Sequence, residues 1–381
     1  MNHIVTSTSS YRKLAEEVIA RMEYGNTLTG GQQGTVVPVS VETIEKMNPA
    51  LKKQLITDYY GEYDHTFFGD GEEHHVFTDF DQFIGKNVIL IGGTINPAET
   101  LELFHMACTI VEVARSLTIV VPYFGYSTME RRTIPGEIVK AEKNMHLLKS
   151  IPDAEIKNTF IFFDLHTEGL PYYLGADVRK FHIYTKSLVI NAAKEISKGR
   201  DFVLGSVDTG RSKWIESLAK DMTKEFGKKI EPTIVSKHHV PGTTETEVTG
   251  HQGANPKGKV VIIYDDMVRT GGSVVKAAQL YRELGATEVH MICTHGLFPK
   301  VERETKIGLP EKVPSSKMLT EPRLVTTNSG KPAKEEKPVI DSLWTTDTHP
   351  NVYKEGMGDL KIQSIAGLVA STVKKMSEFI S

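Results

Sequence analysis

Residues 260–273, VVIIYDDMVRTGGS, decide the fold and point to a ligand. The run of apolar, β-forming residues at the start predicts a buried central strand of a parallel sheet. Two adjacent acids, Asp265 and Asp266, follow at the carboxyl end of that strand. A short loop, 270–273, then opens a segment whose apolar residues have helical spacing, VKAAQLYRELGA. The stretch therefore predicts a strand, an acid pair, a glycine-containing loop and a helix, in that order.

Each part of this stretch suits a phosphorylated sugar. Gly271 and Gly272 let backbone N–H groups approach an anion, and the helix N-terminus behind them adds favourable partial charge. Thr270 and Ser273 supply hydroxyl donors, while the two carboxylates can accept hydrogen bonds from sugar hydroxyls. The alternative is an ordinary strand, polar turn and helix, which accounts for the glycines but not for the acid pair. We therefore favour a pocket for a phosphorylated ribose.

The composition limits the class of protein and of partner. The chain has 381 residues, enough for two α/β domains, and a formal net charge of −3, so no basic excess indicates nucleic acid or an anionic membrane as a partner. Its two cysteines, Cys108 and Cys293, lie in apolar sequence, which argues against a disulfide framework. The sequence shows neither the pattern of a signal peptide nor an apolar run of membrane-spanning length. We therefore expect a cytoplasmic protein.

Predicted strands alternate with predicted helices, which is typical of mainly parallel sheets covered by helices on both faces. The predicted strands are 87–92, 117–123, 159–163, 202–206, 233–236, 260–264 and 289–294, and the predicted helices are 99–114, 136–148, 212–226 and 274–284. Because the pattern starts again near residue 185, we expect an α/β protein with two related domains, each a mainly parallel sheet flanked by helices. The first domain would be 1–184 with the C-terminal helix 360–381, and the second 185–359.

Three segments interrupt this alternation. Residues 27–63 are partly glycine-rich and partly mixed polar. Residues 238–259 are polar without periodicity, which predicts a mobile loop over the site. Residues 299–337 are rich in Lys, Glu, Pro and Ser, which predicts a surface insertion.

Six further motifs follow one another along most of the chain. They are F-G-D-G-E at 68–72, a segment ending M-E-R-R at 122–132, D-L-H at 164–166, S-V-D at 206–208, Lys237, and T-H-G at 294–296. In this order they resemble the ribose-phosphate diphosphokinases, also called phosphoribosyl-pyrophosphate synthetases. The loop at 265–273 also resembles that of type I phosphoribosyltransferases, but single-domain enzymes of that kind share only the loop. The resemblance implies two phosphoribosyltransferase-like domains.

The resemblance also implies a reaction. Such enzymes transfer the β,γ-diphosphoryl group of Mg²⁺-bound ATP to the 1-hydroxyl of a 5-phosphorylated ribose, by default ribose 5-phosphate, and leave AMP. Lys237 would neutralise charge on the transferred group, His166 would bind the metal or orient the triphosphate, and Asp208 would hold Mg²⁺ through water. Further residues implied by the resemblance are Asp265, Asp266, Arg269, Thr270, Gly271, Gly272 and Ser273 for the acceptor, and Phe68, Asp70, Glu72, Arg131 and Arg132 for ATP, with Asp70 and Glu72 reaching in from a neighbouring subunit.

Plainer alternatives stand beside these roles. His166 could be a core histidine whose hydrogen bonds are satisfied, Asp208 a helix N-cap, and Lys237 a solvated lysine. Asp70 and Glu72, taken alone, form a turn. The resemblance also implies a homo-oligomer, dimer-based, with a hexamer as the larger assembly.

Two departures from the family pattern open further alternatives. The family's R-Q-D-R is T-M-E-R at 128–131, so ATP binding is rearranged or lost. Arg269 stands where the synthetases usually carry an acid, and a guanidinium can grip an additional phosphate. ADP-ribose is therefore an alternative acceptor, although Arg269 could equally face solvent or a nearby acid. A catalytically silent relative that regulates a partner synthetase is a third alternative.

Overall fold

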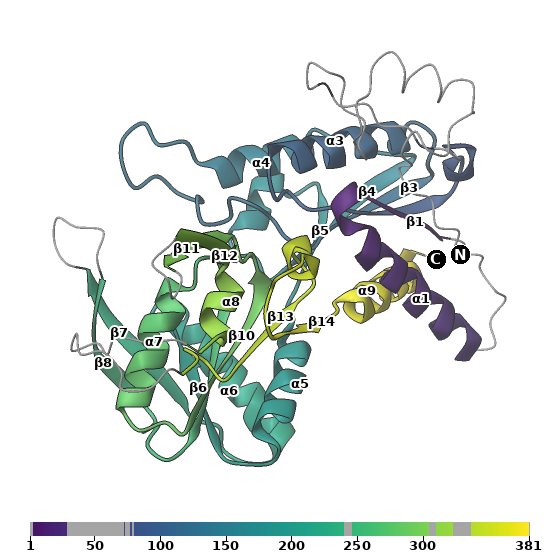
Figure 1. The fold of residues 1–381 in the computed structure, drawn as a ribbon. Helices are drawn as coiled ribbons and strands as arrows, with labels where there is room; N and C mark the ends of the chain where they lie inside the picture. The colour runs from purple at the N-terminus through teal and green to yellow at the C-terminus, as the bar shows by residue number, and fades with distance from the viewer. Residues whose placement is uncertain are drawn as a thin grey trace. The chain divides into compact units, whose positions relative to one another are not determined.

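The computed structural model describes residues 3–28, 72, 77, 80–239, 246–304, 310–322 and 337–380 (Figure 1). The chain forms two compact units, here called unit 1 and unit 2. Unit 1 comprises Met1–Ile183 and Ile365–Ser381, and unit 2 comprises Tyr184–Ser364. Within the described ranges, no helix combines the length and apolar character that crossing a bilayer requires.

Unit 1 is built on a five-stranded parallel sheet in the order β1-β2-β3-β4-β5. The strands are β1 (His3–Ser7), β2 (Asn87–Ile91), β3 (Ser116–Val121), β4 (Ile156–Phe163) and β5 (Arg179–Ile183). The helices are α1 (Arg12–Leu28), α3 (Pro97–Val111), α4 (Lys140–Lys149) and α9 (Ala366–Ile380), with short 3-10 turns η1 (Ser9–Tyr11), η3 (Phe80–Phe83) and η4 (Leu170–Leu174). Helices α3 and α4 cover one face of the sheet, and α1 and α9 pack against each other on the other face (Figure 1).

Unit 2 is built on a seven-stranded sheet in the order β14-β13-β10-β9-β6-β7-β8. The strands are β6 (Phe202–Ser206), β7 (Pro232–His239), β8 (Thr246–Gly253), β9 (Val260–Val268), β10 (Glu288–Gly296), β13 (Ser342–Thr346) and β14 (Leu360–Gln363). All neighbours are parallel except β7 and β8. Helices α5 (Lys186–Ser197) and α6 (Ser212–Phe226) pack on one face, and α7 (Gly272–Glu283) and α8 (Ser315–Thr320) on the other, with a 3-10 turn η5 (Pro350–Tyr353).

The sequence explains these elements locally. Strands β2 and β9 are near-continuous apolar runs because helices cover both faces of a parallel sheet. Helix α3 begins where the Asn96 side chain accepts a hydrogen bond from the backbone N–H of Glu99, at 3.1 Å, and Pro97 occupies its first turn. Helix α6 ends at Phe226 and is followed by Gly227, whose φ of 63° suits a residue without Cβ.

The structure confirms the predicted fold class, since both units are mainly parallel sheets flanked by helices. It contradicts two details of the predicted elements. Residues 238–259 are not a loop throughout, because β8 forms an antiparallel edge strand on β7, and an edge strand of polar residues gives no apolar alternation. The predicted C-terminal helix starts only at Ala366, after the strand β14. Most of the segment 27–63 lies outside the described residues.

The predicted surface insertion at 299–337 is partly wrong as well. It contains an antiparallel hairpin of β11 (Lys300–Glu304) and β12 (Pro310–Pro314), followed by α8. Ser315, Ser316 and Leu319 of α8 are buried, so this part is packed into unit 2 rather than lying on its surface. The charged and proline-rich composition of this segment indicated a surface position, and the few residues that pack into unit 2 were therefore not predicted.

Candidate functional site

In unit 2, the acid pair and the loop lie together at the carboxyl end of β9. Asp265 and Asp266 are among the last residues of that strand, Gly271 is the N-cap of α7, and Gly272 is the first residue of that helix. Gly271 has a φ of 82°, and a Cβ placed on it would meet Leu319 at 3.1 Å. Gly272 has open space around it, and the first N–H groups of α7 are not used within the helix. This arrangement is suited to an anion.

Around this loop, the three polar side chains predicted for the acceptor are exposed. They are Arg269, Thr270 and Ser273. The backbone carbonyl of Arg269 accepts a hydrogen bond from the hydroxyl of Ser315, while Leu319 packs beside Gly271. Helix α8 therefore supports the loop through Ser315 and Leu319. The sequence analysis did not predict this role.

The two acids differ in environment. Asp266 is buried and forms an ion pair with Arg211, which precedes α6. Asp265 is half-buried, and burial together with the negative charge of Asp266 raises its pKa well above the usual range. Asp266 is therefore the acid that pairs directly with Arg211, while Asp265 accepts a hydrogen bond from the backbone N–H of Asp266 at 2.9 Å. The sequence missed Arg211, because no local pattern links it to Asp266.

Asp208 lies on the turn between β6 and α6. Its carboxylate accepts a hydrogen bond from the backbone N–H of Gly210 at 2.9 Å, whereas the N-cap position of α6 is Arg211. The alternative of a helix N-cap is therefore wrong for Asp208. Its charge contributes to the raised pKa of Asp265, which places it among the same group of acids.

A buried polar cluster supports the neighbouring strand ends. The Thr294 hydroxyl lies 2.9 Å from the hydroxyls of both Tyr264 and Thr185. The Thr294 carbonyl accepts from Thr346 at 2.7 Å and from Thr348 at 3.0 Å. The T-H-G motif is therefore held by residues 345–349, T-T-D-T-H, which the sequence analysis did not single out. The run of five polar residues at 345–349, which begins inside β13, was the available signal.

Lys237 lies in β7, opposite Val248 of β8, next to an irregularity in the strand pairing after Ser236. The structure describes the backbone of Lys237 but not its side chain. The predicted catalytic lysine is thus on an edge hairpin of unit 2, and its role stays a prediction.

In unit 1, Asp164 and His166 follow the carboxyl end of β4. Asp164 is buried with a φ of 34°, a conformation that costs energy for a residue with a side chain and often occurs at functional sites. The backbone N–H of Leu165 donates to Nε2 of His182 at 2.9 Å. His166 is half-buried, and its role stays a prediction.

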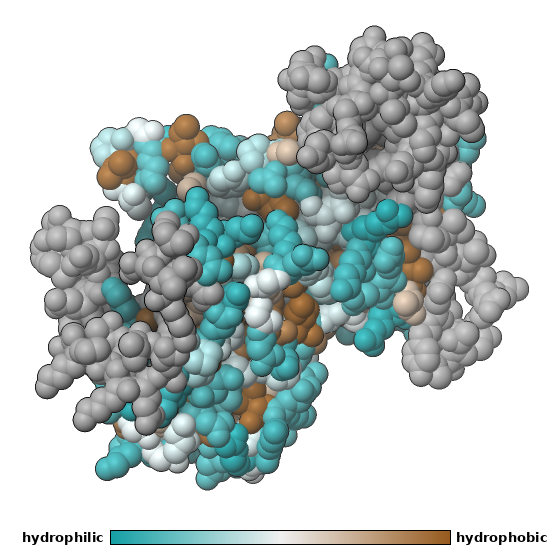
Figure 2. Space-filling model, in the orientation of Figure 1, coloured by the Kyte–Doolittle hydropathy of each residue, from teal (hydrophilic) through white to brown (hydrophobic). Residues whose placement is uncertain are grey.

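The candidate ATP segment changes from buried to exposed along its length. At Gly125 a Cβ would overlap the Thr94 carbonyl oxygen, while Arg131 and Arg132 are exposed. Figure 2 shows apolar residues among hydrophilic ones on the segment between β3 and α4, and its exposed apolar residues are Met129, Ile134 and Ile138. Phe68 and Asp70 lie outside the described residues, and Glu72 is exposed.

No group of three or more His, Cys, Asp or Glu side chains suited to a metal ion occurs in the described part of the chain. Such a group is not required for Mg²⁺, which usually keeps several waters and binds one or two carboxylates together with substrate phosphates. Asp208 provides an oxygen donor of this type in unit 2, and His166 lies in unit 1. The residues present therefore fit a Mg²⁺ ion whose ligands come mainly from the phosphates of a bound substrate.

Two family models match the chain. The N-terminal domain of ribose phosphate pyrophosphokinase matches residues 3–151, and the phosphoribosyl transferase domain matches residues 187–316. The chain belongs to the ribose-phosphate pyrophosphokinase family. The first match falls in unit 1 and the second in unit 2.

Individual members of this family are similar over different lengths. Ribose-phosphate pyrophosphokinase 2, chloroplastic, of Oryza sativa subsp. japonica is 32% identical over 246 residues, which cover 62% of this chain and 57% of that protein. The corresponding proteins of Spinacia oleracea and Arabidopsis thaliana are each 30% identical, and the matches cover 63% and 65% of their lengths, so the chain spans less than two thirds of these plant relatives. Ribose-phosphate pyrophosphokinase of Rhodopirellula baltica is 28% identical, with 81% of this chain and 85% of that protein covered.

The fold has a solved counterpart. The crystal structure of phosphoribosylpyrophosphate synthetase from Mycobacterium smegmatis matches with a TM-score of 0.67 and 20% identity, covering 99% of each chain. This similarity concerns the fold alone.

Proposed function

We propose that the chain transfers the β,γ-diphosphoryl group of Mg²⁺-bound ATP to the 1-hydroxyl of ribose 5-phosphate, giving phosphoribosyl pyrophosphate and AMP. The observation that carries this proposal is the loop of unit 2, where a helix N-terminus, Gly271 and the half-buried acid Asp265 lie at the end of a parallel strand. Membership of the ribose-phosphate pyrophosphokinase family supports it.

The acceptor would bind by its phosphate to the loop. Backbone N–H groups at the start of α7 and the hydroxyls of Thr270 and Ser273 would donate to the 5-phosphate. Asp265 would accept hydrogen bonds from ribose hydroxyls, while Arg211 keeps the charge of Asp266 balanced. These contacts together would fix the orientation of the sugar.

In the reaction, the 1-hydroxyl oxygen forms a bond to the β-phosphorus of ATP and releases its proton. The bond between that phosphorus and the oxygen bridging the α- and β-phosphates breaks, and AMP leaves with that oxygen. Lys237 would neutralise the charge that develops on the transferred group, and Arg131 and Arg132 would bind the nucleotide phosphates. When bound, Mg²⁺ supplies charge neutralisation to the triphosphate, with Asp208 and His166 as the residues that would hold it.

ADP-ribose is the second candidate acceptor. Arg269 is exposed at the loop, and its backbone is fixed by Ser315, so its guanidinium is suited to grip a further phosphate at the 5-end of the sugar. The product would then be ADP-ribose 1-pyrophosphate. We also propose that the chain forms a homo-oligomer built from dimers, with a hexamer as the larger assembly. Light scattering would measure the mass of the assembly.

One experiment separates these candidates. The protein is incubated with Mg²⁺, ATP and either ribose 5-phosphate or ADP-ribose, and AMP is followed by chromatography. AMP that depends on ribose 5-phosphate is the expected result, and AMP that depends on ADP-ribose identifies the second candidate. No AMP with either acceptor contradicts both and leaves the silent relative. The variant Arg269→Asp tests the second phosphate contact, because unchanged use of ADP-ribose would show that this contact is absent.

A further inference from the structure

The chain of unit 1 turns sharply where β4 ends, at the D-L-H motif. Phe163 is the last residue of β4 and is the register partner of Ile183 in β5. Asp164 follows with a φ of 34°, which is uncommon for a residue that carries a side chain. Such a conformation costs energy and persists only where the surrounding contacts determine it. The contacts that hold this turn therefore bear on the position of His166, two residues later.

Two successive backbone N–H groups of the turn are held by β5. The N–H of Asp164 donates to the carbonyl oxygen of Ile183 at 3.0 Å. The N–H of Leu165 donates to Nε2 of His182 at 2.9 Å. The strand β5 ends at Ile183, and the second bond goes to a side chain of the strand rather than to its backbone. His182 is thus the side chain that fixes the backbone directly before His166.

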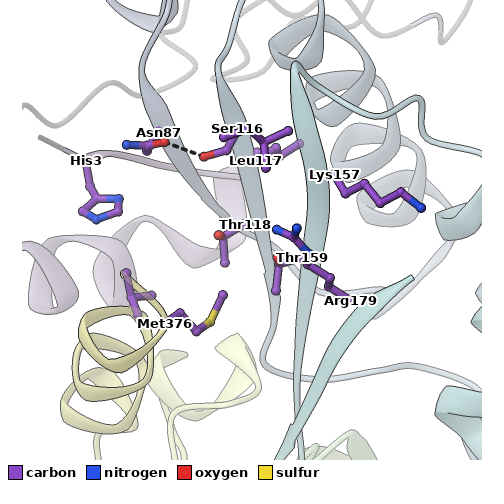
Figure 3. Close-up of a pocket in the computed structure, with 11 residues that line it drawn as sticks. His3, Asn87, Ser116, Leu117, Thr118, Lys157, Thr159, Arg179 and Met376 are labelled. Atoms are coloured by element: carbon purple, nitrogen blue, oxygen red, sulfur yellow. Dashed lines mark hydrogen bonds between the residues drawn. The ribbon is translucent and has the colours of Figure 1, made fainter. Parts of the chain in front are cut away.

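The imidazole of His182 lies on the face of the sheet that α4 covers. Arg179 of the same strand lies on the other face, where it lines a pocket with Thr159 of β4 and Met376 of α9 (Figure 3). Side chains of a strand alternate between the two faces, so His182, three positions further on, points to the opposite side. Its register partner is Phe162, a buried core residue. The half-buried ring therefore stands at the border of the apolar core of unit 1.

The bond to Leu165 also fixes the protonation state of His182. A backbone N–H can only donate, so Nε2 is the unprotonated nitrogen of a neutral imidazole that carries its proton on Nδ1. Leu165 is buried, and removal of this acceptor would deprive the N–H of a buried residue of its partner. The ring therefore serves the turn as a hydrogen-bond acceptor at a fixed place.

We propose that His182 is a positioning residue for His166. Its Nε2 holds Leu165 and thereby sets the position from which the imidazole of His166 meets the triphosphate or its metal. The proposal rests on the proposed function, in which His166 has that role. A misplacement of about 1 Å can cost about a hundredfold in rate, so a bond that fixes the preceding backbone matters to turnover. His182 itself needs no contact with the substrate.

Substitution by glutamine separates this role from general packing. The Oε1 atom of Gln can take nearly the place of Nε2 of His, and it accepts hydrogen bonds. His182→Gln should therefore keep the bond to Leu165, whereas His182→Ala removes it. Phe181→Ala is the matched control, because Phe181 is the neighbouring residue of the same edge strand, is exposed, and points to the other face.

Hydrogen exchange of the full chain, measured by mass spectrometry with fragmentation that resolves single amides, tests the contact. In His182→Ala the N–H of Leu165 should exchange about tenfold faster or more, because it loses its hydrogen bond. In His182→Gln and in Phe181→Ala its exchange should stay within about threefold of the wild type. If His182→Ala does not fold, His182→Leu replaces it, since leucine fills the space of the ring without an acceptor.

Steady-state kinetics of AMP formation tests the consequence for turnover. In His182→Ala kcat should fall about tenfold or more while KM for ATP changes far less, and His182→Gln should recover most of the loss. Unchanged exchange or unchanged kcat in His182→Ala would overturn the proposal, and so would a His182→Gln variant that behaves like His182→Ala. A wild type that forms no AMP contradicts the proposed function instead, and the exchange measurement, which needs no turnover, then still decides whether His182 holds Leu165.

Discussion

At the scale of single residues, the backbone of Gly271 determines the shape of the acceptor loop. Its φ of 82° strains a residue that carries a side chain, and a Cβ would lie 3.1 Å from Leu319, which would have to shift. Gly271→Ala should lower the free energy of unfolding by about 1–3 kcal/mol, measured in urea, and raise KM for the acceptor. Gly272→Ala is the matched control, since its Cβ meets open space. An equal loss of stability in the two variants would contradict this account of the loop.

Asp265 predicts a dependence of stability on pH. Its pKa is raised in the folded protein, so the fold disfavours its ionised form. The unfolded chain releases this proton at lower pH, and the stability of the wild type is therefore lost as pH rises from about 4 through the folded-state pKa. Asp265→Asn should be more stable than the wild type at neutral pH, and the difference should disappear below about pH 4. Unfolding in urea at several pH values measures the difference in free energy of unfolding between the variant and the wild type. A difference that does not change with pH would show that the titration of Asp265 is not its cause.

The proposed role of Lys237 predicts that its substitution affects kcat much more than the acceptor KM. If its charge acts mainly on the group in transfer, Lys237→Ala should lower kcat by about a hundredfold or more while the acceptor KM changes far less. Steady-state kinetics measures both. Lys229→Ala, which removes an exposed lysine paired with Glu231, should change neither. A rise in KM with unchanged kcat would make Lys237 a binding residue instead.

At the scale of elements, α8 supports the acceptor loop from outside the strand–loop–helix unit. Leu319→Ala should cost about 2–5 kcal/mol of stability and also raise the acceptor KM, because Leu319 packs beside Gly271. Val313→Ala, in the adjoining strand β12, removes a buried side chain of the same cluster and should cost stability without raising KM. Steady-state kinetics and urea unfolding of both variants test this role of α8. A similar acceptor KM in the two variants would show that α8 does not support the acceptor loop.

The sequence predicted the buried elements better than the edges. Central strands such as β3 and β9 were found because burial on both faces demands continuous apolar runs. The edge strands β8 and β14 were missed because solvent contact removes that demand, so TEVTGHQG resembles a loop. Asp164 and Asp208 follow the predicted strands 159–163 and 202–206 in the sequence, and in the structure they come just after the carboxyl ends of β4 and β6.

Contacts between distant segments were beyond local patterns. Arg211 pairs with Asp266 across a long stretch of chain, and Thr294 accepts hydrogen bonds from Thr346 of β13 and from Thr348 just after that strand. Such pairs follow from strand order, which no single segment encodes. The acid pair was therefore predicted as two equivalent ligands, whereas the structure makes them different.

At the scale of the whole molecule, two mainly parallel units carry the two family domains, with the acceptor loop in unit 2 and the D-L-H motif in unit 1. The central claim is that this chain moves an intact diphosphoryl group onto a phosphorylated ribose. Phosphorus NMR of the protein with Mg²⁺, ATP and ribose 5-phosphate tests it most directly. We predict that the signals of AMP and of a diphosphate attached to the ribose grow together in equal amounts. ADP or inorganic phosphate in place of AMP, or an unchanged ATP spectrum, would contradict it.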